Sequence, residues 1–197
     1  MDCIFITNDD GLNEGIETLI SYLHKYEIPL LAVIPDENKS ATSMSISLRK
    51  KMKLLRKFDL EKKLKINKTP MKIFTLGGTP TDCSLFVDFA KESDLLENYN
   101  PIFAISGVNN GANLSHDVLH SGTVGAARQA SMNGIPSLAS SYCDYNGEEI
   151  NKASKLTSRI VKFLWNKTKS EDIIEKSFND GTLFLNLNIP SGWNGEL

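Results

Sequence analysis

The chain has 197 residues, of which 41% are hydrophobic and 23% charged, and its formal net charge is −2. This composition is typical of a globular domain, and it excludes collagen-like, low-complexity and strongly charged disordered chains. The small net charge provides no global attraction to DNA or to an anionic membrane. We therefore expect a single folded domain over residues 1–197, with neither DNA nor a membrane as its partner.

The three cysteines are far apart in the sequence, at Cys3, Cys83 and Cys143. Their odd number and the absence of a Cys-x-x-Cys pair disfavour a disulfide framework or a zinc knuckle, and both features suit a reducing cytosol. The acidic N-terminus and short first apolar run do not form a signal peptide, and no run reaches membrane-spanning length. We therefore expect a cytoplasmic protein.

The first predicted element is a buried strand over the apolar run Cys3–Ile6, and apolar residues at helical spacing from Ile16 to Leu23 predict a helix after it. The loop between them reads Asn8-Asp9-Asp10-Gly11. Such loops, at the carboxyl ends of strands, are where open α/β sheets bind ligands. Two adjacent carboxylates repel each other unless water or a cation separates them, so the loop predicts a metal site. The alternative is a turn followed by a helix N-cap.

The next predicted strand is Pro29–Ile34, which would form a parallel βαβ unit with the first, and a long hydroxyl-rich loop follows over Asp36–Ser45. Residues 49–75 form a basic excursion, with eleven Lys/Arg residues against two acids between Arg49 and Lys72. We predict two or three short strands in it between Met52 and Ile73. Its positive charge could belong to a solvated face or could attract an anionic substrate.

After this excursion the chain predicts a strand at Lys72–Leu76, followed by the polar loop Gly77–Asp82. A further strand at Pro101–Ile105 is followed by the polar loop Ser106–Asn113. The first of these loops would begin a helix that runs through Ala90.

A second polar helix start reads Ser121-Gly122-Thr123. It predicts either a phosphate site made of backbone N–H groups or only an N-cap. The chain then predicts a strand at Ile135–Ser140, a long amphipathic helix at Glu148–Asn166 and a last strand at Leu183–Ile189. The expected apolar side of the long helix carries Ala153, Leu156, Ile160, Phe163 and Leu164.

The polar loops follow four strands of the predicted sheet, and the carboxyl ends of parallel strands meet at one edge. Carboxylates, hydroxyls, asparagines and glycine-rich N–H groups suit a hard cation together with a phosphate, whereas zinc would require His and Cys. The sequence contains no Walker loop and no Gly-x-Ser-x-Gly nucleophile elbow.

These blocks stand in the order seen in the SurE family, which the chain resembles from about Met1 to Pro190. The blocks are Asn8-Asp9-Asp10-Gly11, Pro35-Asp36 with Ser40, Gly78-Thr79-Pro80-Thr81-Asp82-Cys83, Ser106-Gly107-Val108-Asn109 and Ser121-Gly122-Thr123-Val124. The resemblance implies an α/β fold: a Rossmann-like three-layer sandwich with a mostly parallel central sheet and a small β-hairpin excursion. It also implies a metal-dependent phosphomonoesterase of nucleoside 5′- and 3′-monophosphates, that is, a 5′-nucleotidase and acid-type phosphatase.

By resemblance, one divalent cation per subunit, Mg²⁺ or Mn²⁺, is expected on four ligands: Asp9, Asp10, Ser40 and Asn109. Of these, Asp9, Asp10 and Asn109 are the expected catalytic residues. The expected substrate-binding residues are Asn8, Ser40, Gly107, Asn109, Ser121, Gly122 and Thr123. The expected substrates are nucleoside monophosphates, with polyphosphate as a further candidate.

The chain departs from the family pattern in two places. His120 stands where the family often has a tyrosine before Ser-Gly-Thr, which could alter the rim of the pocket. Family members usually continue for several tens of residues beyond the last predicted strand, so a C-terminal arm that helps subunits pair is expected to be short or missing. The family's usual homodimer or homotetramer is the expected assembly, which a short arm would affect.

Two rival functions remain open at this stage. A haloacid-dehalogenase-type phosphatase would form a covalent aspartyl-phosphate, but its chemistry typically needs Asp-x-Asp, whereas Asp9 and Asp10 are adjacent. A nucleotide-binding regulator without turnover would use a similar pocket. A turnover assay distinguishes this second rival from an enzyme.

Overall fold

The computed structural model describes residues 1–96, 98–144, 149–168, 180 and 183–193. Within them the chain forms one sheet with the strand order β3-β4-β2-β1-β5-β6-β7. The strands are β1 (Asp2–Thr7), β2 (Leu30–Pro35), β3 (Leu54–Arg56), β4 (Met71–Leu76), β5 (Asn100–Asn110), β6 (Ser137–Cys143) and β7 (Leu185–Pro190). All neighbouring strands are parallel except β3 and β4. The predicted mostly parallel α/β sheet is therefore confirmed.

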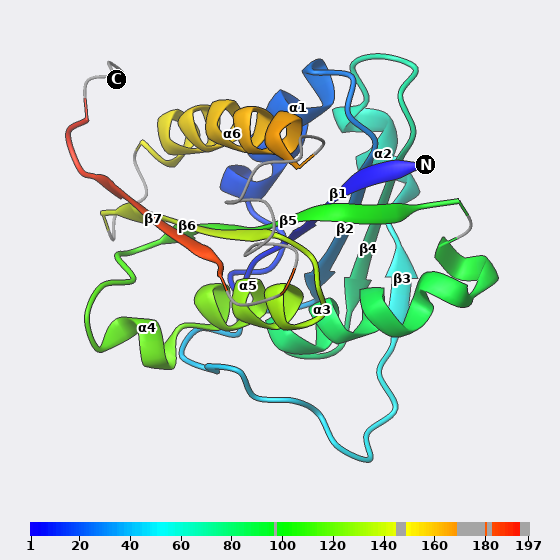
Figure 1. The fold of residues 1–197 in the computed structure, drawn as a ribbon, viewed down its shortest axis with the longest axis horizontal. Coiled ribbons are helices and arrows are strands. Elements are labelled where there is room, and N and C mark those ends of the chain that lie inside the picture. The colour runs from blue at the N-terminus through cyan, green and yellow to red at the C-terminus, as the bar shows by residue number, and fades with distance from the viewer. Residues whose placement is uncertain (97, 145–148, 169–179, 181–182, 194–197) are drawn as a thin grey trace.

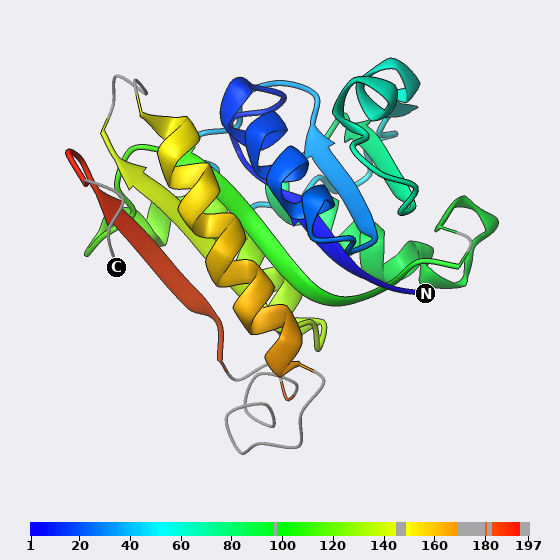
Figure 2. The same cartoon turned by 90° about the horizontal axis from the view of Figure 1, so that it is seen from above.

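The helices form the other two layers of the molecule (Figure 1). They are α1 (Glu14–Lys25), α2 (Phe58–Leu64), α3 (Pro80–Phe89), α4 (Asp117–His120), α5 (Gly122–Met132) and α6 (Ile150–Lys167). Helices α1 and α6 lie side by side on one face of the sheet, as the view from above shows (Figure 2), and α3 and α5 cover the opposite face. None of the described helices is long and apolar enough to cross a lipid bilayer.

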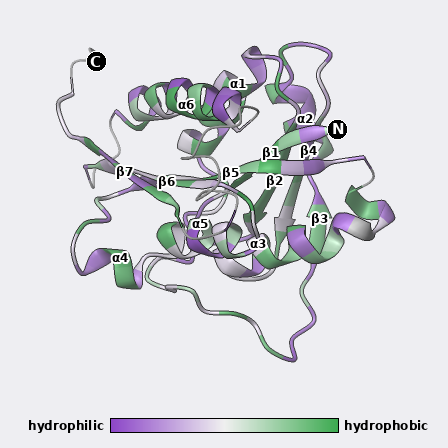
Figure 3. Ribbon diagram, in the orientation of Figure 1, coloured by the Kyte–Doolittle hydropathy of each residue, from purple (hydrophilic) through white to green (hydrophobic). Residues whose placement is uncertain are grey.

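Two hydrophobic cores fill the spaces between these layers. Successive side chains of a strand point to opposite faces, so Ile4 and Ile6 of β1 join the core under α1 and α6, whereas Cys3 and Phe5 join the core under α3 and α5. The hydropathy colouring shows the same arrangement, with hydrophobic strands in the middle of the molecule (Figure 3). Because both faces are covered, β1 and β2 contain the uninterrupted apolar runs Cys3–Ile6 and Leu30–Ile34.

The parallel register brings the ends of the central strands to one edge. Thr7 at the end of β1 lies opposite Ser106 of β5, and Pro35 at the end of β2 lies opposite Leu76 of β4. The residues that follow these positions therefore meet at the carboxyl edge, as the sequence predicted.

The basic excursion differs from the prediction of two or three short strands. It contains only the three-residue strand β3 before helix α2, and the chain then enters β4 of the main sheet. A helix forms because Leu60 and Leu64, four residues apart, reach the same core together. The predicted β-hairpin is thus an antiparallel pair, β3 with β4, separated by a helix.

Two further features differ from the sequence prediction, the end of β5 and the buried face of α6. Strand β5 does not end at Ile105 but continues to Asn110, with a register shift against β6 between Ser106 and Asn109. In α6, Phe163 was expected on the apolar side but is 61% exposed, while Val161 and Trp165 are buried instead. The predicted first residue of this helix, Glu148, lies outside the described residues.

Buried His24 ties the loop before β4 to helix α1. Its Nδ1 accepts a hydrogen bond from the Ile66 N–H at 3.1 Å, so Nε2 carries the proton and donates to the Thr69 carbonyl at 3.0 Å. Asn67 Nδ2 donates to the His24 carbonyl at 2.6 Å. One imidazole therefore satisfies a donor and an acceptor of a segment 42 to 45 residues away.

We predict that His24→Phe lowers the free energy of unfolding by about 1–3 kcal/mol, because the loop loses both partners of the imidazole. Urea unfolding followed by circular dichroism measures the change. The control is His116→Phe, since His116 is exposed. Equal stability of the two variants would contradict the role of His24.

Candidate functional site

Asp9 is the most buried acid of the carboxyl edge, with 2% of its surface exposed. Its Oδ1 accepts a hydrogen bond from the Thr123 hydroxyl at 2.6 Å, and its Oδ2 accepts one from the Thr123 N–H at 3.1 Å. The Asp9 carbonyl accepts from the Lys39 N–H at 2.6 Å. Three segments, after β1, after β2 and at the start of α5, therefore fix this residue.

Asp10 is held less tightly than Asp9 and is partly exposed. Asn38 Nδ2 donates to Asp10 Oδ1 at 3.2 Å, and the Asn110 N–H donates to Oδ2 at 3.3 Å. Its carboxylate therefore joins the loop after β2 to the end of β5.

The electrostatics of the two carboxylates are unfavourable as they stand. Burial raises the pKa of the Asp9 carboxyl, against the lowering effect of the hydrogen bonds from Thr123. Burial, and then the charge of Asp9, raise the pKa of Asp10 to about 6. Among the ion pairs of the described residues, none involves either aspartate. Lys39, whose backbone N–H donates to the Asp9 carbonyl, pairs through its side chain with Glu37 instead.

The two expected asparagines lie at the same edge. Asn109 is 9% exposed, and its Nδ2 donates to the Gly111 carbonyl at 2.8 Å, which leaves the amide oxygen as the group it can offer to a ligand. Asn8 Nδ2 donates to the Gly11 carbonyl at 2.7 Å, while the buried Asn8 Oδ1 has no hydrogen-bond partner. The site thus contains a buried oxygen that its protein neighbours do not satisfy.

Ser40 is the exposed member of the expected set. Its N–H donates to Asn38 Oδ1 at 2.9 Å, and the same Asn38 donates to Asp10. Asn38 therefore links the Ser40 backbone to the Asp10 carboxylate. Sequence reasoning did not single out Asn38 or Asn110, and the only signal for them was their position in polar loops.

The start of α5 is used differently from the phosphate site that the sequence suggested. Ser121 Oγ accepts from the Val124 N–H at 3.1 Å and caps the helix, while both donors of Thr123 go to Asp9. Gly122 packs so closely on the acid that an added Cβ would lie 2.9 Å from the Asp9 Cβ. In this geometry the anion at the helix N-terminus is the protein's own carboxylate.

Gly107 bends β5 towards Asn109. Its φ of +128° is in the region that favours glycine, and a Cβ there would lie 2.3 Å from the Ser140 carbonyl oxygen of β6. It is fully enclosed by protein, so it shapes the site through the backbone.

The oxygen-only donor set limits which metals the site could hold. No group of three or more His, Cys, Asp or Glu side chains gathers among the residues that the structure describes. A cation here would be held by two carboxylates with neutral hydroxyl and amide oxygens, which is a set for a hard divalent cation. A buried carboxylate pair without a cationic partner is costly, and a divalent ion would offset that cost.

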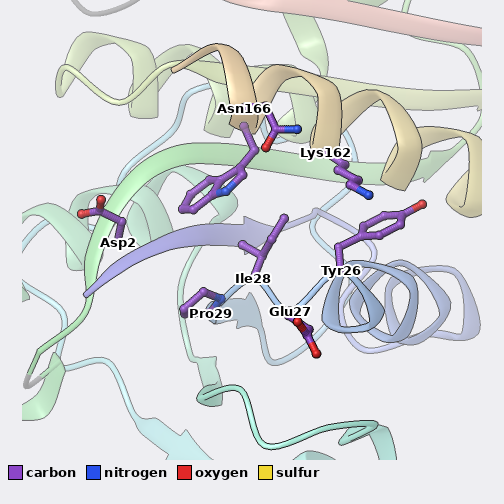
Figure 4. A pocket seen from close by; sticks show the side chains of 8 residues that line it. Asp2, Tyr26, Glu27, Ile28, Pro29, Lys162 and Asn166 are labelled. Carbon is purple, nitrogen blue, oxygen red and sulfur yellow. The ribbon is translucent and has the colours of Figure 1, made fainter. Parts of the chain in front are cut away.

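A separate cavity of about 330 Å³ lies at the opposite edge of the sheet. It is lined by Asp2 at the start of β1, the turn before β2 and the end of α6 (Figure 4). In the close view Tyr26 and Lys162 lie at one end of this cavity and Asp2 at the other. It shares no residue with the acidic site.

The fold and the candidate site together define an α/β protein with two adjacent aspartates at the carboxyl edge of a mostly parallel sheet. The model of the family described as Survival protein SurE matches residues 4–197, and the chain belongs to this family.

Known proteins similar to the chain include several bacterial relatives. The 5′-nucleotidase SurE of Thermoanaerobacter sp. (strain X514) is 39% identical over 189 residues, covering 95% of this chain and 65% of that protein. The 5′-nucleotidase SurE of Clostridium beijerinckii is 36% identical over 190 residues, covering 95% of this chain and 66% of that protein. The crystal structure of the SurE protein from Aquifex aeolicus has a TM-score of 0.72 and 30% identity, covering 95% of this chain and 66% of that one. The chain thus spans about two thirds of the length of these relatives.

We predict that Gly107→Ala destabilises the protein by about 1–3 kcal/mol more than Gly192→Ala, because its methyl group would overlap the Ser140 carbonyl. Gly192 is a matched control, since it also has a positive φ, +71°, but has nothing within 4 Å of its added Cβ. Thermal and urea unfolding of both variants measure the difference. Similar losses would mean that β5 and β6 can separate without strain at this point.

Proposed function

We propose that this chain is a metal-dependent phosphomonoesterase that hydrolyses nucleoside 5′- and 3′-monophosphates to nucleoside and phosphate. The observation that carries the proposal is the buried Asp9 carboxylate beside Asp10 at the carboxyl edge of the sheet, where no ion pair of the described residues neutralises either acid. The relatives named 5′-nucleotidase support the nucleotide substrate.

The proposed cofactor is one Mg²⁺ or Mn²⁺ per subunit, held by Asp9, Asp10, Ser40 and Asn109. The unsatisfied Asn8 Oδ1 close by in sequence fits a polar, ion-binding pocket better than a sealed core. When bound, the ion supplies Lewis-acid polarisation of a phosphoryl oxygen and offsets negative charge in the transition state.

The arrangement of Asp9 favours transfer of the phosphoryl group directly to water. A nucleophilic carboxylate must turn one oxygen in line with the leaving group, but the two hydrogen bonds from Thr123 hold both Asp9 oxygens in one orientation. A cation on the remaining lone pairs would also partly neutralise the carboxylate and weaken it as a nucleophile. This disfavours the aspartyl-phosphate of a haloacid-dehalogenase-type enzyme. A non-catalytic regulator remains the second alternative, and turnover of a nucleotide decides against it.

The remaining features of the proposal follow the family resemblance. Polyphosphate is a further candidate substrate, and a homodimer or homotetramer is the expected assembly. A cytoplasmic site of action suits the three free cysteines Cys3, Cys83 and Cys143.

The basic excursion contains two groups of lysines at opposite edges of the sheet. The first group is Lys50, Lys51 and Lys53, and the second is Lys62, Lys65 and Lys68. The hydrogen bond and charge of Lys39 lower the pKa of Glu37 in the loop after β2, and the charge of Lys50 adds to this effect. The Lys53 carbonyl accepts from the Gly77 N–H at 2.9 Å, just after the end of β4. Lys68, in contrast, precedes Pro70, whose carbonyl accepts from the Leu30 N–H at the start of β2. Only the first group lies at the edge that carries the acidic site, so only this group is placed to attract an anionic substrate to it.

We predict that the site depends on a divalent cation. Excess EDTA should abolish phosphate release from a panel of nucleoside monophosphates, and Mn²⁺ or Mg²⁺ should restore it. Asp9→Asn and Asp10→Asn should each lower kcat/KM by about 100-fold or more, because each removes a charged ligand. The control is Asp59→Asn in α2, an exposed acid that should leave activity unchanged.

Full activity in excess EDTA would refute the metal assignment. Absence of turnover with every nucleotide and metal, from a folded protein, would favour the regulator.

We further predict that Lys50→Gln, Lys51→Gln and Lys53→Gln together lower kcat/KM by about tenfold at low salt and much less at high salt, where screening weakens long-range attraction. The matched control is the triple change Lys62→Gln, Lys65→Gln and Lys68→Gln, which removes the same charge from exposed lysines of α2 and the following loop. Steady-state kinetics at both ionic strengths measure the effect. An equal effect of the two triple variants would favour a role of net charge alone. No effect, or the same effect at both ionic strengths, would favour a merely solvated face.

A further inference from the structure

Thr123 is fully buried at the start of α5 and directs both of its donors at one carboxylate. Its hydroxyl lies 2.6 Å from Asp9 Oδ1 and its N–H lies 3.1 Å from Oδ2, although the two residues are 114 positions apart in the sequence. The pair therefore forms a two-point contact, and hydrogen bonds to a charged acceptor are stronger than neutral ones.

The helix itself does not need these donors to be placed in this way. Ser121 already accepts the Val124 N–H and provides the N-cap of α5. Thr123 lies two residues after this N-cap, and its hydroxyl bonds to Asp9 and not to a group of the helix. Its burial and direction are explained by Asp9 alone.

The surroundings remove other positions that the Asp9 side chain could adopt. Gly122 leaves just enough room for it, because an added Cβ would lie 3.1 Å from Asp9 Oδ2 and 3.0 Å from Thr42 Oγ1. On the other side, the Lys39 N–H holds the Asp9 carbonyl. The backbone and both side-chain oxygens are therefore fixed before any ligand arrives.

We infer that Thr123 is the positioning residue of Asp9: it fixes the carboxylate so that the remaining lone pairs of its two oxygens are directed to a divalent cation. This inference rests on the proposed metal site, and it replaces the expectation that Thr123 donates to the substrate phosphate. A carboxylate offers about four lone-pair directions, so two hydrogen bonds leave it able to bind an ion. Loss of a residue that orients a metal ligand typically lowers the affinity for the metal by about 10- to 100-fold.

The first experiment measures Mn²⁺ binding to the metal-free chain by isothermal titration calorimetry. Thr123→Val and Thr123→Ala, which remove the hydroxyl, should raise the Mn²⁺ Kd by about 10- to 100-fold, and Thr123→Ser should restore it to near the original value. The matched control is Thr157→Val in α6, which removes a buried hydroxyl that lies 2.8 Å from Ser140 Oγ of β6. This variant should leave the Mn²⁺ Kd unchanged.

A second experiment needs no metal. Thermal unfolding in EDTA is compared for the original chain, Thr123→Val, Asp9→Ala and the double variant. Thr123→Val removes a hydrogen-bond donor from the buried Asp9 carboxylate, and this cost arises only when Asp9 is present. The loss of Tm in the double variant should therefore be smaller than the sum of the two single losses.

The outcomes separate the inference from the proposed function. If the original chain binds Mn²⁺ and the hydroxyl-free variants bind it equally well, the positioning role is overturned. If the original chain binds no Mn²⁺ while the Tm losses are non-additive, the proposed metal function fails and the Thr123–Asp9 contact stands. Additive Tm losses overturn the inference in either case.

Discussion

The structure around the carboxyl edge depends on keeping a charged carboxylate in a place that is almost closed to water. Asp9 follows directly from a buried central strand, and an acid in such a place is stable only if other groups compensate its charge. The start of α5 provides this compensation through N–H and hydroxyl donors, and the positive end of the helix dipole adds to it. Gly122 packs closely against Asp9 at the same point, where an added Cβ would lie 2.9 Å from the Asp9 Cβ.

A division of roles between the two aspartates follows from their surroundings. Asp9 is rigid, buried and bonded through both oxygens, whereas Asp10 is partly exposed and receives two longer hydrogen bonds from Asn38 and the Asn110 backbone. Asp9 thus belongs to the scaffold as much as to the site, and Asp10 lies closer to solvent and to an incoming ligand. In the proposed site, neutral oxygens of Ser40 and Asn109 would complete a set that suits hard cations.

The same edge is connected to the far side of the sheet through asparagines. Asn113, after β5, receives two hydrogen bonds on its carbonyl from Asn186 and Asn188 of β7, and its N–H donates to Asn188 Oδ1. The alternating polar pattern of the last strand therefore holds the loop that follows Asn109. This gives β7, which is distant from Asp9 in the sheet order, a structural link to the site.

The sequence by itself determined the order of the strands and helices of the main sheet, apart from α2 and α4, together with the parallel α/β class and the edge at which the polar loops meet. Local apolar periodicity and turn composition encode these features. The resemblance to the SurE family grouped Asp9, Asp10, Ser40 and Asn109 as expected metal ligands, and this grouping stays a prediction. The sequence did not predict helix α2, since short runs of leucine and lysine fit a strand or a helix and only the shared core of Leu60 and Leu64 decides between them. Only the tertiary structure placed Thr123 on Asp9 and Gly107 against Ser140, because contacts between residues far apart in the chain depend on how the layers pack.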